Sequence, residues 1–265
     1  MNQYGMLVDL TKCIGCRGCQ VACKQWNDMP AELTRNRGTY QNPPRLTSKT
    51  LTNIEFREVE LKDKLAWVFV KRQCMHCEHP GCVAACTVGA LQKRAEGPVV
   101  YDENRCIGCR YCMYACPFGV PTFEWDQTFA LIKKCELCID RVDAGMKPAC
   151  AKTCPAGAIQ FGDREELLLV ARERVYAKNS PYIKHIYGEE EIGGTSWLYL
   201  SSVPFEQIGF PTLPKETPVY LNDKILHATP TIALGMALAL SGVYWMVKRR
   251  NVIREYLAAE NHAEK

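Results

Sequence analysis

The arrangement of the cysteines constrains this chain more than any other feature of its sequence. The segment CIGCRGCQVAC spaces four cysteines at intervals of three, three and four residues, and nearly the same letters return later as CIGCRYCMYAC. All sixteen cysteines divide into four groups of four, with none left over. In chain order, the groups are Cys13, Cys16, Cys19 and Cys23; Cys74, Cys77, Cys82 and Cys86; Cys106, Cys109, Cys112 and Cys116; and Cys135, Cys138, Cys150 and Cys154.

The spacing distinguishes among three uses for so many cysteines. A disulfide framework is typical of a short secreted chain with a signal peptide, whereas the start MNQYGMLVDL has no basic region and no long apolar run. Structural zinc sites use pairs of Cys-x2-Cys knuckles. A triplet followed by x3-Cys is the bacterial ferredoxin pattern for [4Fe–4S] clusters. We therefore predict four [4Fe–4S] clusters, with zinc or disulfides as the alternatives.

The same pattern predicts that the groups work in pairs. In such a run three cysteines bind one cluster, and the fourth usually binds the neighbouring cluster. Only 19 residues separate Cys86 from Cys106, so the second and third groups are expected to pair, which leaves the first group for the fourth. The spacer predicts a short helix or turn, a break at Gly97-Pro98 and the strand VVY. The expected fold class is α+β, with two ferredoxin-like units that each hold two clusters.

These pairs set the expected domain boundaries. An outer ferredoxin-like unit takes residues 1–73 and 117–177, an inserted unit takes 74–116, and an irregular strap follows over 178–227. Within them, TNIEFREVEL, KLAWVFVKRQC, PAGAIQFG and SWLYLSSV predict strands. Asp163 and Glu166 predict a capped helix start. Residues 24–73 are an insertion, which is either a docking surface for a partner or a plain hairpin that covers the clusters.

The segment ATPTIALGMALALSGVYWMV, residues 228–247, carries no charge. Its length suits a hydrocarbon core of ~30 Å, so it predicts one transmembrane helix in contact with lipid, with a buried core helix as the alternative. Pro230 lies near the predicted helix start, where proline is tolerated. The basic tail, 248–265, begins with Lys248, Arg249 and Arg250 and predicts a cytoplasmic C-terminus. The clusters are then expected on the periplasmic side of the inner membrane, exported with a signal-bearing partner.

The formal net charge is only +4, which does not suggest a nucleic-acid partner. Basic residues are nonetheless frequent beside the cysteine groups. They are Lys12, Arg17, Lys24, Arg105, Arg110, Lys133, Lys134 and Lys152. Either these residues offset the charge of bound clusters, or they are solvated surface residues.

The spacers within the groups are, in order, x2-x2-x3, x2-x4-x3, x2-x2-x3 and x2-x11-x3. This order resembles the four-cluster iron–sulfur subunits of molybdopterin-dependent oxidoreductases. The resemblance is closer to the β (iron–sulfur) subunit of membrane-bound respiratory formate dehydrogenase. It is carried by CIGCRGCQVACKQWND, YQNPP, CMHCEHPGC, CELCIDRV, PACAKTCPAGAI and GGTSWLYL, together with the single C-terminal membrane helix.

The resemblance implies four ligand sets, which agree with the pairing expected above. Set a is Cys13, Cys16, Cys19 and Cys154; set b is Cys23, Cys135, Cys138 and Cys150; set c is Cys74, Cys77, Cys82 and Cys116; and set d is Cys86, Cys106, Cys109 and Cys112. Thr87 stands where such runs usually have proline, a departure that removes no ligand. Because each cluster already has four thiolates, His76 and His79 are expected to support the ligands rather than bind iron.

The resemblance also implies that this chain has no catalytic site of its own. A catalytic subunit with a molybdopterin (Mo/W) cofactor would oxidise formate, and an integral membrane cytochrome b would reduce quinone. This chain would pass electrons between the two. One alternative is the equivalent electron-transfer subunit of a membrane-bound [NiFe] hydrogenase or of another molybdopterin oxidoreductase. Another is a free-standing polyferredoxin tethered to the membrane.

Overall fold

The computed structural model describes residues 3–61 and 64–263. Contacts divide the chain into two compact units, the N-terminal unit Met1–Val219 and the C-terminal unit Tyr220–Lys265. The strands are β1 (Tyr4–Asp9), β2 (Asn53–Leu61), β3 (Lys64–Arg72), β4 (Leu91–Lys93), β5 (Val99–Tyr101), β6 (Thr122–Phe123), β7 (Ile132–Lys133), β8 (Ile159–Asp163) and β9 (Trp197–Leu200). The α-helices are α1 (Gly18–Trp26), α2 (Gly81–Ala84), α3 (Tyr111–Ala115), α4 (Ile139–Asp143), α5 (Ala149–Lys152), α6 (Arg164–Tyr176) and α7 (Val219–Ala263), and the 3-10 turns are η1 (Glu103–Arg105), η2 (Glu191–Gly193) and η3 (Phe205–Ile208). This mixture agrees with the predicted α+β content.

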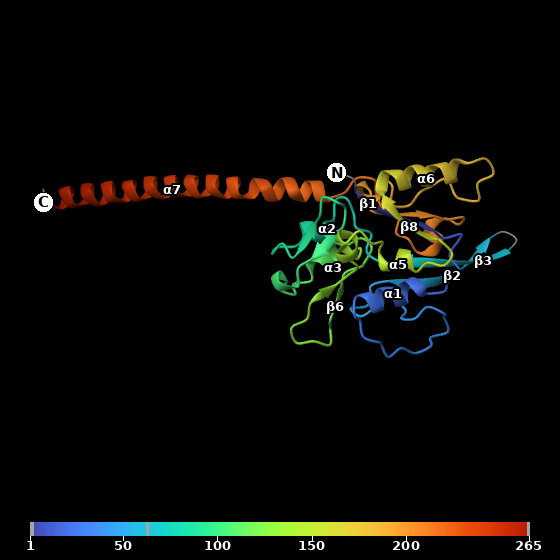
Figure 1. Ribbon diagram of the computed structural model, residues 1–265. Coiled ribbons are helices and arrows are strands. Elements are labelled where there is room, and N and C mark those ends of the chain that lie inside the picture. The colour runs from blue at the N-terminus through green and yellow to red at the C-terminus, as the bar shows by residue number, and fades with distance from the viewer. Residues whose placement is uncertain (1–2, 62–63, 264–265) are drawn as a thin grey trace. The chain divides into compact units, whose positions relative to one another are not determined.

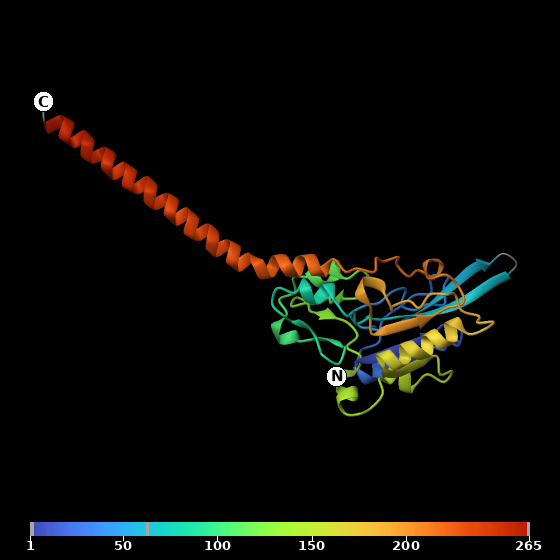
Figure 2. The same ribbon diagram turned by 90° about the horizontal axis from the view of Figure 1, so that it is seen from above.

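A three-stranded sheet in the order β8-β1-β9 joins the two ends of the N-terminal unit. Strand β1 runs antiparallel to β8 and parallel to β9. Leu7 and Leu198 face α6, which packs across all three strands (Figures 1 and 2). Met6 and Trp197 face the main core on the other side, because successive side chains of a strand point to opposite faces.

The predicted strands of the insertion form the antiparallel hairpin β2–β3, with Phe56 opposite Phe69. Ile54 and Val70 of this hairpin enter the main core, which also contains Cys19, Cys77 and Cys150. The hairpin therefore covers part of the cysteine-rich core.

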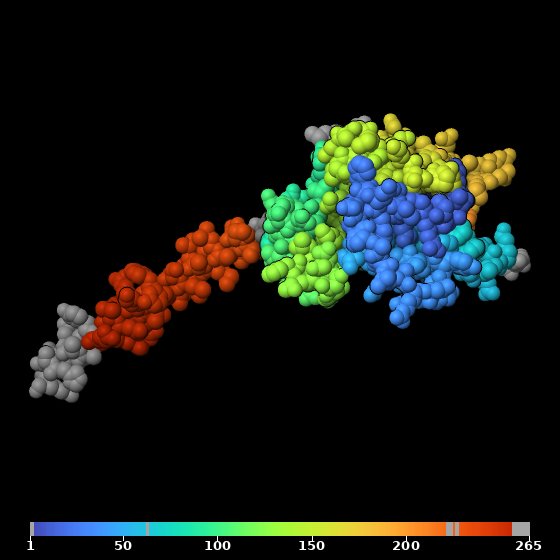
Figure 3. Space-filling model, turned by 60° about the horizontal axis from the view of Figure 1, so that its bottom comes forward, coloured from blue at the N-terminus to red at the C-terminus, as the bar shows by residue number. Residues whose placement is uncertain are grey.

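Residues 24–52, which precede the hairpin, lie beside the green segment near residues 106–130 on the face that Figure 3 shows. Lys49 Nζ lies 2.7 Å from Asp126 Oδ2 and joins the two segments. The insertion is thus attached, just before β2, to the loop between β6 and β7.

The spacer between the second and third cysteine groups contains the expected turn, at 87–88, and the expected strand VVY, which is β5, together with a further strand, β4, that was not expected. Leu91 pairs with Tyr101 in the short hairpin β4–β5. Leu91 and Val99 are buried in one cluster, whereas Gln92 between the strand's other residues is exposed. This alternation suits a half-buried strand, and the helical segment that the structure describes within this spacer is the 3-10 turn η1.

Two pairs of short helices bring distant parts of the chain together. Helix α1 follows the first cysteine triplet and packs against α5 of the fourth group, while α2 of the second group packs against α3 of the third. Figure 1 shows both pairs. The predicted cap of α6 is present, since the Asp163 side chain accepts from the backbone N–H groups of Glu165 and Glu166 at 2.9 and 3.2 Å.

The C-terminal unit is formed by one helix, α7, which has 45 residues. The helix begins at Val219, within the expected strap, and continues to Ala263, through the expected basic tail. Pro230 lies inside the helix rather than near its start. Lysine and arginine are good helix formers, so the change from apolar to basic residues does not end the helix. Ala228–Glu255 is long and apolar enough to cross a membrane, with mean hydropathy 1.5, and none of its most apolar window is buried. This exposure does not fit the alternative of a buried core helix.

Candidate iron–sulfur cluster sites

All sixteen cysteines are free thiols within the N-terminal unit. Eight are buried: Cys19, Cys23, Cys74, Cys77, Cys82, Cys112, Cys135 and Cys150. Only Cys16 and Cys109 are exposed, and they occupy the same position in the first and third groups. The disulfide alternative therefore does not match the structure.

Each cysteine group bends in the same way. The second residue after its first cysteine has a left-handed backbone, with φ of +68° at Gly15, +49° at His76, +69° at Gly108 and +61° at Leu137. Glycine adopts this conformation freely, whereas other L-residues avoid it at a cost of about 1–2 kcal/mol. Four repeats of one unusual conformation, two of them on strained residues, indicate that the loop shape is required at each group.

The bend turns backbone N–H groups toward sulfur atoms. The N–H of Gly18 donates to Cys16 Sγ at 3.5 Å, and that of Gly108 donates to Cys106 Sγ at 3.4 Å. Leu137 N–H and Cys135 Sγ make the same contact at 3.4 Å. Donors of this kind stabilise thiolates and are one means by which a protein raises the reduction potential of an iron–sulfur cluster.

Cysteines of the first and fourth groups lie close together. Cys13, Cys16, Cys19 and Cys154 line one small cavity. Burial raises the pKa of Cys19 to about 12, and Cys150 and Cys13 act in the same direction. Burial raises the pKa of Cys138 to about 12 as well, again with the help of Cys150 and Cys23. Thiols that repel each other's ionisation in this way are close neighbours.

The second and third groups meet in the same manner. Burial raises the pKa of Cys82 to about 12, with contributions from Cys74, Cys116 and Cys112. Burial also raises the pKa of Cys112 to about 11, and the neighbouring thiols act with it; they are Cys109, Cys86 and Cys106. The two pairs of groups are also close to each other. Burial raises the pKa of Cys135, and Cys74, from the other pair of groups, adds to this rise.

This donor set fits iron–sulfur clusters. Thiols with such raised pKa values are protonated at neutral pH, so a metal must displace the protons, which soft metals do because they bind thiolate strongly. Among residues 3–61 and 64–263, no group of three or more His, Cys, Asp or Glu lies close enough to bind one metal ion. The ligands of a cubane bind its separate corners and stand further apart than the ligands of a single ion.

Of three buried polar groups among the thiols, the sequence named His76 and Lys134 as residues that could support the clusters, but it missed Lys71. Lys71, Lys134 and His76 are 1, 4 and 0 % exposed. The sequence indicated Lys134 only as one basic residue among eight, and Lys71 escaped notice because a lysine at the end of a strand is normally solvated. Burial and nearby lysine ammonium groups hold the pKa of His76 well below its ordinary value, and its Nε2 is buried without a hydrogen-bond partner among the described residues.

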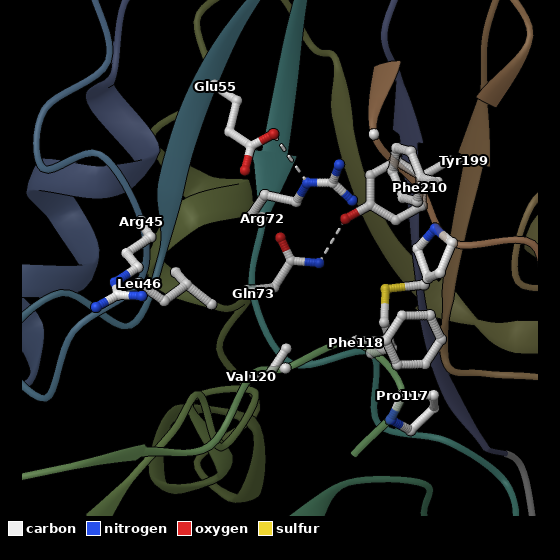
Figure 4. A pocket seen from close by; sticks show the side chains of 14 residues that line it. Arg45, Leu46, Glu55, Arg72, Gln73, Pro117, Phe118, Val120, Tyr199 and Phe210 are labelled. Atoms are coloured by element: carbon white, nitrogen blue, oxygen red, sulfur yellow. Dashed lines mark hydrogen bonds and ion pairs between the residues drawn. The ribbon is translucent and has the colours of Figure 1, made fainter. Parts of the chain in front are cut away.

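Sequence neighbours of Cys74 and Cys116, among them Gln73 and Pro117, line a groove of ≈ 400 Å³ (Figure 4). Arg72 Nε lies 3.3 Å from Glu55 Oε2, and Gln73 Nε2 donates to Tyr199 Oη at 2.5 Å. None of the fourteen residues drawn there is a serine, cysteine or histidine. The groove therefore has no serine, cysteine or histidine to act as a nucleophile or base, and its one carboxylate, Glu55, is paired with Arg72.

Comparison with known proteins gives one family match and several long relatives. Residues 65–164, which span the second to fourth groups, match the family described as a 4Fe-4S dicluster domain. The nitrate-inducible formate dehydrogenase iron-sulfur subunit of Escherichia coli K12 is 41% identical over 248 residues, which cover 91% of this chain and 83% of that protein. The formate dehydrogenase iron-sulfur subunit of Haemophilus influenzae is 38% identical over 249 residues, 91% of this chain and 79% of that protein. The hydrogenase-2 operon protein HybA of Escherichia coli O157:H7 is 34% identical over 295 residues, 98% of this chain and 89% of that protein.

Proposed function

Because the chain belongs to the family of formate dehydrogenase iron–sulfur electron-transfer subunits, we propose that it passes electrons from formate to a membrane quinone pool. Formate would be oxidised in a molybdopterin (Mo/W) catalytic subunit, and quinone would be reduced by an integral membrane cytochrome b subunit. Like its relatives, the chain has no catalytic site of its own. The observation that carries the proposal is the meeting of four cysteine groups, in two pairs, inside one unit.

We propose four [4Fe–4S] clusters on ligand sets a to d. The shared cavity of Cys13, Cys16, Cys19 and Cys154 supports set a. The mutual effects of Cys23, Cys138 and Cys150 support set b. Those among Cys74, Cys77, Cys82 and Cys116 support set c, and those around Cys112 support set d. When bound, such clusters supply one-electron transfer. The chain's own part is to hold the thiolates, donate N–H groups to sulfur and exclude water.

The contacts between sets favour one order, a–b–c–d. Besides burial, Cys150 of set b helps to raise the pKa of Cys19 of set a, Cys74 of set c that of Cys135 of set b, and Cys112 of set d that of Cys82 of set c, so each pair of thiols lies close together. The exposed cysteines, Cys16 and Cys109, then belong to the two end sets. Electrons would enter at one of these ends and leave at the other.

We assign the membrane-proximal end to set d. The chain leaves the N-terminal unit at Val219. A Cβ placed on Gly81, the first residue of α2, would lie 3.8 Å from Val219 Cγ2 and 2.7 Å from the carbonyl oxygen of Ala115 in α3. The chain therefore leaves the N-terminal unit beside the helices that carry sets c and d. Electrons from formate would enter at set a and leave from set d.

We further propose a single-pass location in the inner (cytoplasmic) membrane, with the clusters in the periplasm and the C-terminus in the cytoplasm. The basic residues after the apolar stretch support this orientation. A folded unit of this kind would be exported together with a signal-bearing partner. A protease added to spheroplasts should then cleave the N-terminal unit, whereas protection of that unit would contradict the orientation.

The decisive experiment is to purify the complex anaerobically through this chain and to follow its visible iron–sulfur absorbance. Bleaching by formate alone is the expected result. Bleaching by hydrogen alone would instead make this a hydrogenase subunit, the second candidate, which the long match to HybA favours. No bleaching by either donor would indicate another molybdopterin partner or a free polyferredoxin, and zinc in place of iron would contradict the cluster assignment itself.

A further inference from the structure

Lys71 is the most deeply buried ammonium group among the described lysines of the N-terminal unit. It lies near the end of β3 and is 1 % exposed. Its Nζ donates to Gln73 Oε1 at 2.8 Å and lies 3.4 Å from Thr52 Oγ1. The same atom lies 4.3 Å from the centre of the Trp197 ring. These neighbours are neutral, so they solvate the ammonium without cancelling its charge.

No carboxylate among residues 3–61 and 64–263 lies within ion-pairing distance of Lys71. Lys93, a half-buried lysine, differs, because its Nζ lies 3.5 Å from Glu78 Oε2. A buried charge is costly unless an opposite charge compensates it. The compensating charge of Lys71 must therefore come from groups other than carboxylates.

The thiols of sets a and b surround Lys71. It lines the same cavity as Cys13, Cys19 and Cys154 of set a. Burial is the largest single influence on the pKa of Lys71 and lowers it, but the neighbouring groups, with Cys150 and Cys19 the strongest, together raise that pKa above its ordinary value. Burial raises the pKa values of cysteines in both sets, and Lys71 opposes that rise at four of them, namely Cys13, Cys19, Cys23 and Cys135. The ammonium is thus shared between two neighbouring ligand sets.

We propose that Lys71 is the buried counter-charge of the clusters on sets a and b and that it raises their reduction potentials. Reduction of a cluster adds one negative charge, which a fixed positive charge stabilises. This effect is strong inside a protein, where the effective dielectric constant is far below that of water. Net charge around a cluster is an established means of setting its potential. The inference rests on the proposed function, since it requires clusters on these sets.

The test is a redox titration of the anaerobically purified complex, followed by electron paramagnetic resonance. Lys71→Met removes the charge and keeps an unbranched apolar side chain. We expect the clusters of sets a and b to become harder to reduce, with about a tenfold change in the ratio of reduced to oxidised cluster at fixed potential. This change corresponds to ~59 mV for a one-electron couple. The clusters of sets c and d should shift much less.

Two control variants are needed. One tests whether the charge of Lys71 matters rather than its packing, and the other tests whether a lysine must be buried or need only lie near the clusters. Lys71→Arg keeps the positive charge and should restore potentials close to those of the unaltered protein. Lys152→Met removes an exposed lysine that lies two residues from both Cys150 and Cys154. Because water and salt screen an exposed charge, this variant should shift the same clusters far less than Lys71→Met does.

A second variant covers the case in which Lys71→Met does not assemble its clusters. Gln73→Glu keeps Lys71 and places a carboxylate beside its ammonium, so the pair becomes nearly neutral as seen from sets a and b. The potentials of those clusters should again fall.

Unchanged potentials in an assembled Lys71→Met or Gln73→Glu protein would overturn the proposal, as would an equal shift in Lys152→Met. If the unaltered protein itself gave no iron–sulfur signals, the proposed function would fail instead, and the two failures are thereby distinguished.

Discussion

The backbone N–H of Val99 donates to Nδ1 of His76 at 2.9 Å, across 23 residues of chain. Because Nδ1 accepts this bond, the ring proton of the neutral imidazole lies on Nε2. That Nε2 is buried and has no hydrogen-bond partner in the part of the chain that the structure describes. His76 itself lies between Cys74 and Cys77 in the sequence. A buried donor of this kind is expected to have an acceptor, and sulfur atoms of a bound cluster would provide one. The bond also joins the second cysteine group to β5.

We predict that His76→Phe weakens the N-terminal unit and that His76→Asn does so much less. Phenylalanine leaves the buried Val99 N–H unsatisfied, which costs about 1–3 kcal/mol, and it is strained at a φ of +49°. Asparagine tolerates this left-handed conformation, and its Oδ1 can accept from Val99. The measurement is the urea concentration at which the cluster absorbance is half lost. Equal midpoints for the two variants would contradict the role assigned to Nδ1.

The crossed ligand sets predict which pairs of cysteine substitutions are redundant. Cys154→Ala should remove one cluster and about a quarter of the iron. The double variant Cys19→Ala/Cys154→Ala should lose no more, because both residues belong to set a, although 134 residues separate them in the chain. In contrast, Cys150→Ala/Cys154→Ala should lose two clusters, although these residues are close in sequence. Iron analysis and electron paramagnetic resonance measure the number of clusters lost. Loss of two clusters in Cys19→Ala/Cys154→Ala and of one in Cys150→Ala/Cys154→Ala would contradict the crossed assignment.

The local features could be predicted because nearby residues determine them. The alternation of TNIEFREVEL and KLAWVFVKRQC predicted β2 and β3, and Asp163 predicted the cap of α6. The meeting of the first group with the fourth was also expected, because the fourth cysteine of a ferredoxin run usually serves the neighbouring cluster.

Features that depend on distant contacts could not be predicted. Leu91 joins a strand only because Val99 and Tyr101 return beside it. Lys71 looks like an ordinary surface lysine until Trp197, from a strand more than a hundred residues later, covers it. The left-handed conformation of Leu137 had no glycine to signal it. Each of these features is decided by packing between segments that are far apart in the sequence.

We predict that the Lys49–Asp126 ion pair fastens the insertion to the loop between β6 and β7. The hydrogen bond from Lys49 lowers the pKa of Asp126. A carboxyl with a depressed pKa stabilises the fold above its ordinary pKa and loses this contribution as the pH falls through the depressed value. The pair is therefore intact at pH 7. Asp126→Asn at pH 7 should then speed tryptic cleavage after Arg35 and Arg37 about twofold, the scale of an exposed ion pair.

High salt should speed the same cleavage in the unaltered protein, because salt screens exposed charges. The matched control is Asp143→Asn, which breaks the surface pair with Arg94 Nη1 at 2.9 Å and leaves the insertion untouched. Mass spectrometry of the early fragments identifies the cleavage sites. If both variants increased cleavage after Arg35 equally, the pair with Lys49 would have no specific role.

The last prediction concerns the membrane anchor. A chain that stops after residue 227 lacks the whole apolar stretch Ala228–Glu255, and we expect an alkaline carbonate wash to release it from membranes. An apolar helix of this length stays in the bilayer during such a wash, whereas contacts with partner subunits alone do not survive it. Immunoblots of the washed membranes and of the supernatant measure the partition.

The control is a chain that stops after Glu255, which keeps the apolar stretch and loses only the residues that follow it. This shorter truncation should remain in the washed membranes like the full chain. The chain that stops after residue 227 should still contain iron when purified, because all sixteen cysteines lie before Val219. Retention of that chain in washed membranes would show that α7 is not the anchor, and the assignment of the membrane-proximal end to set d would fail with it.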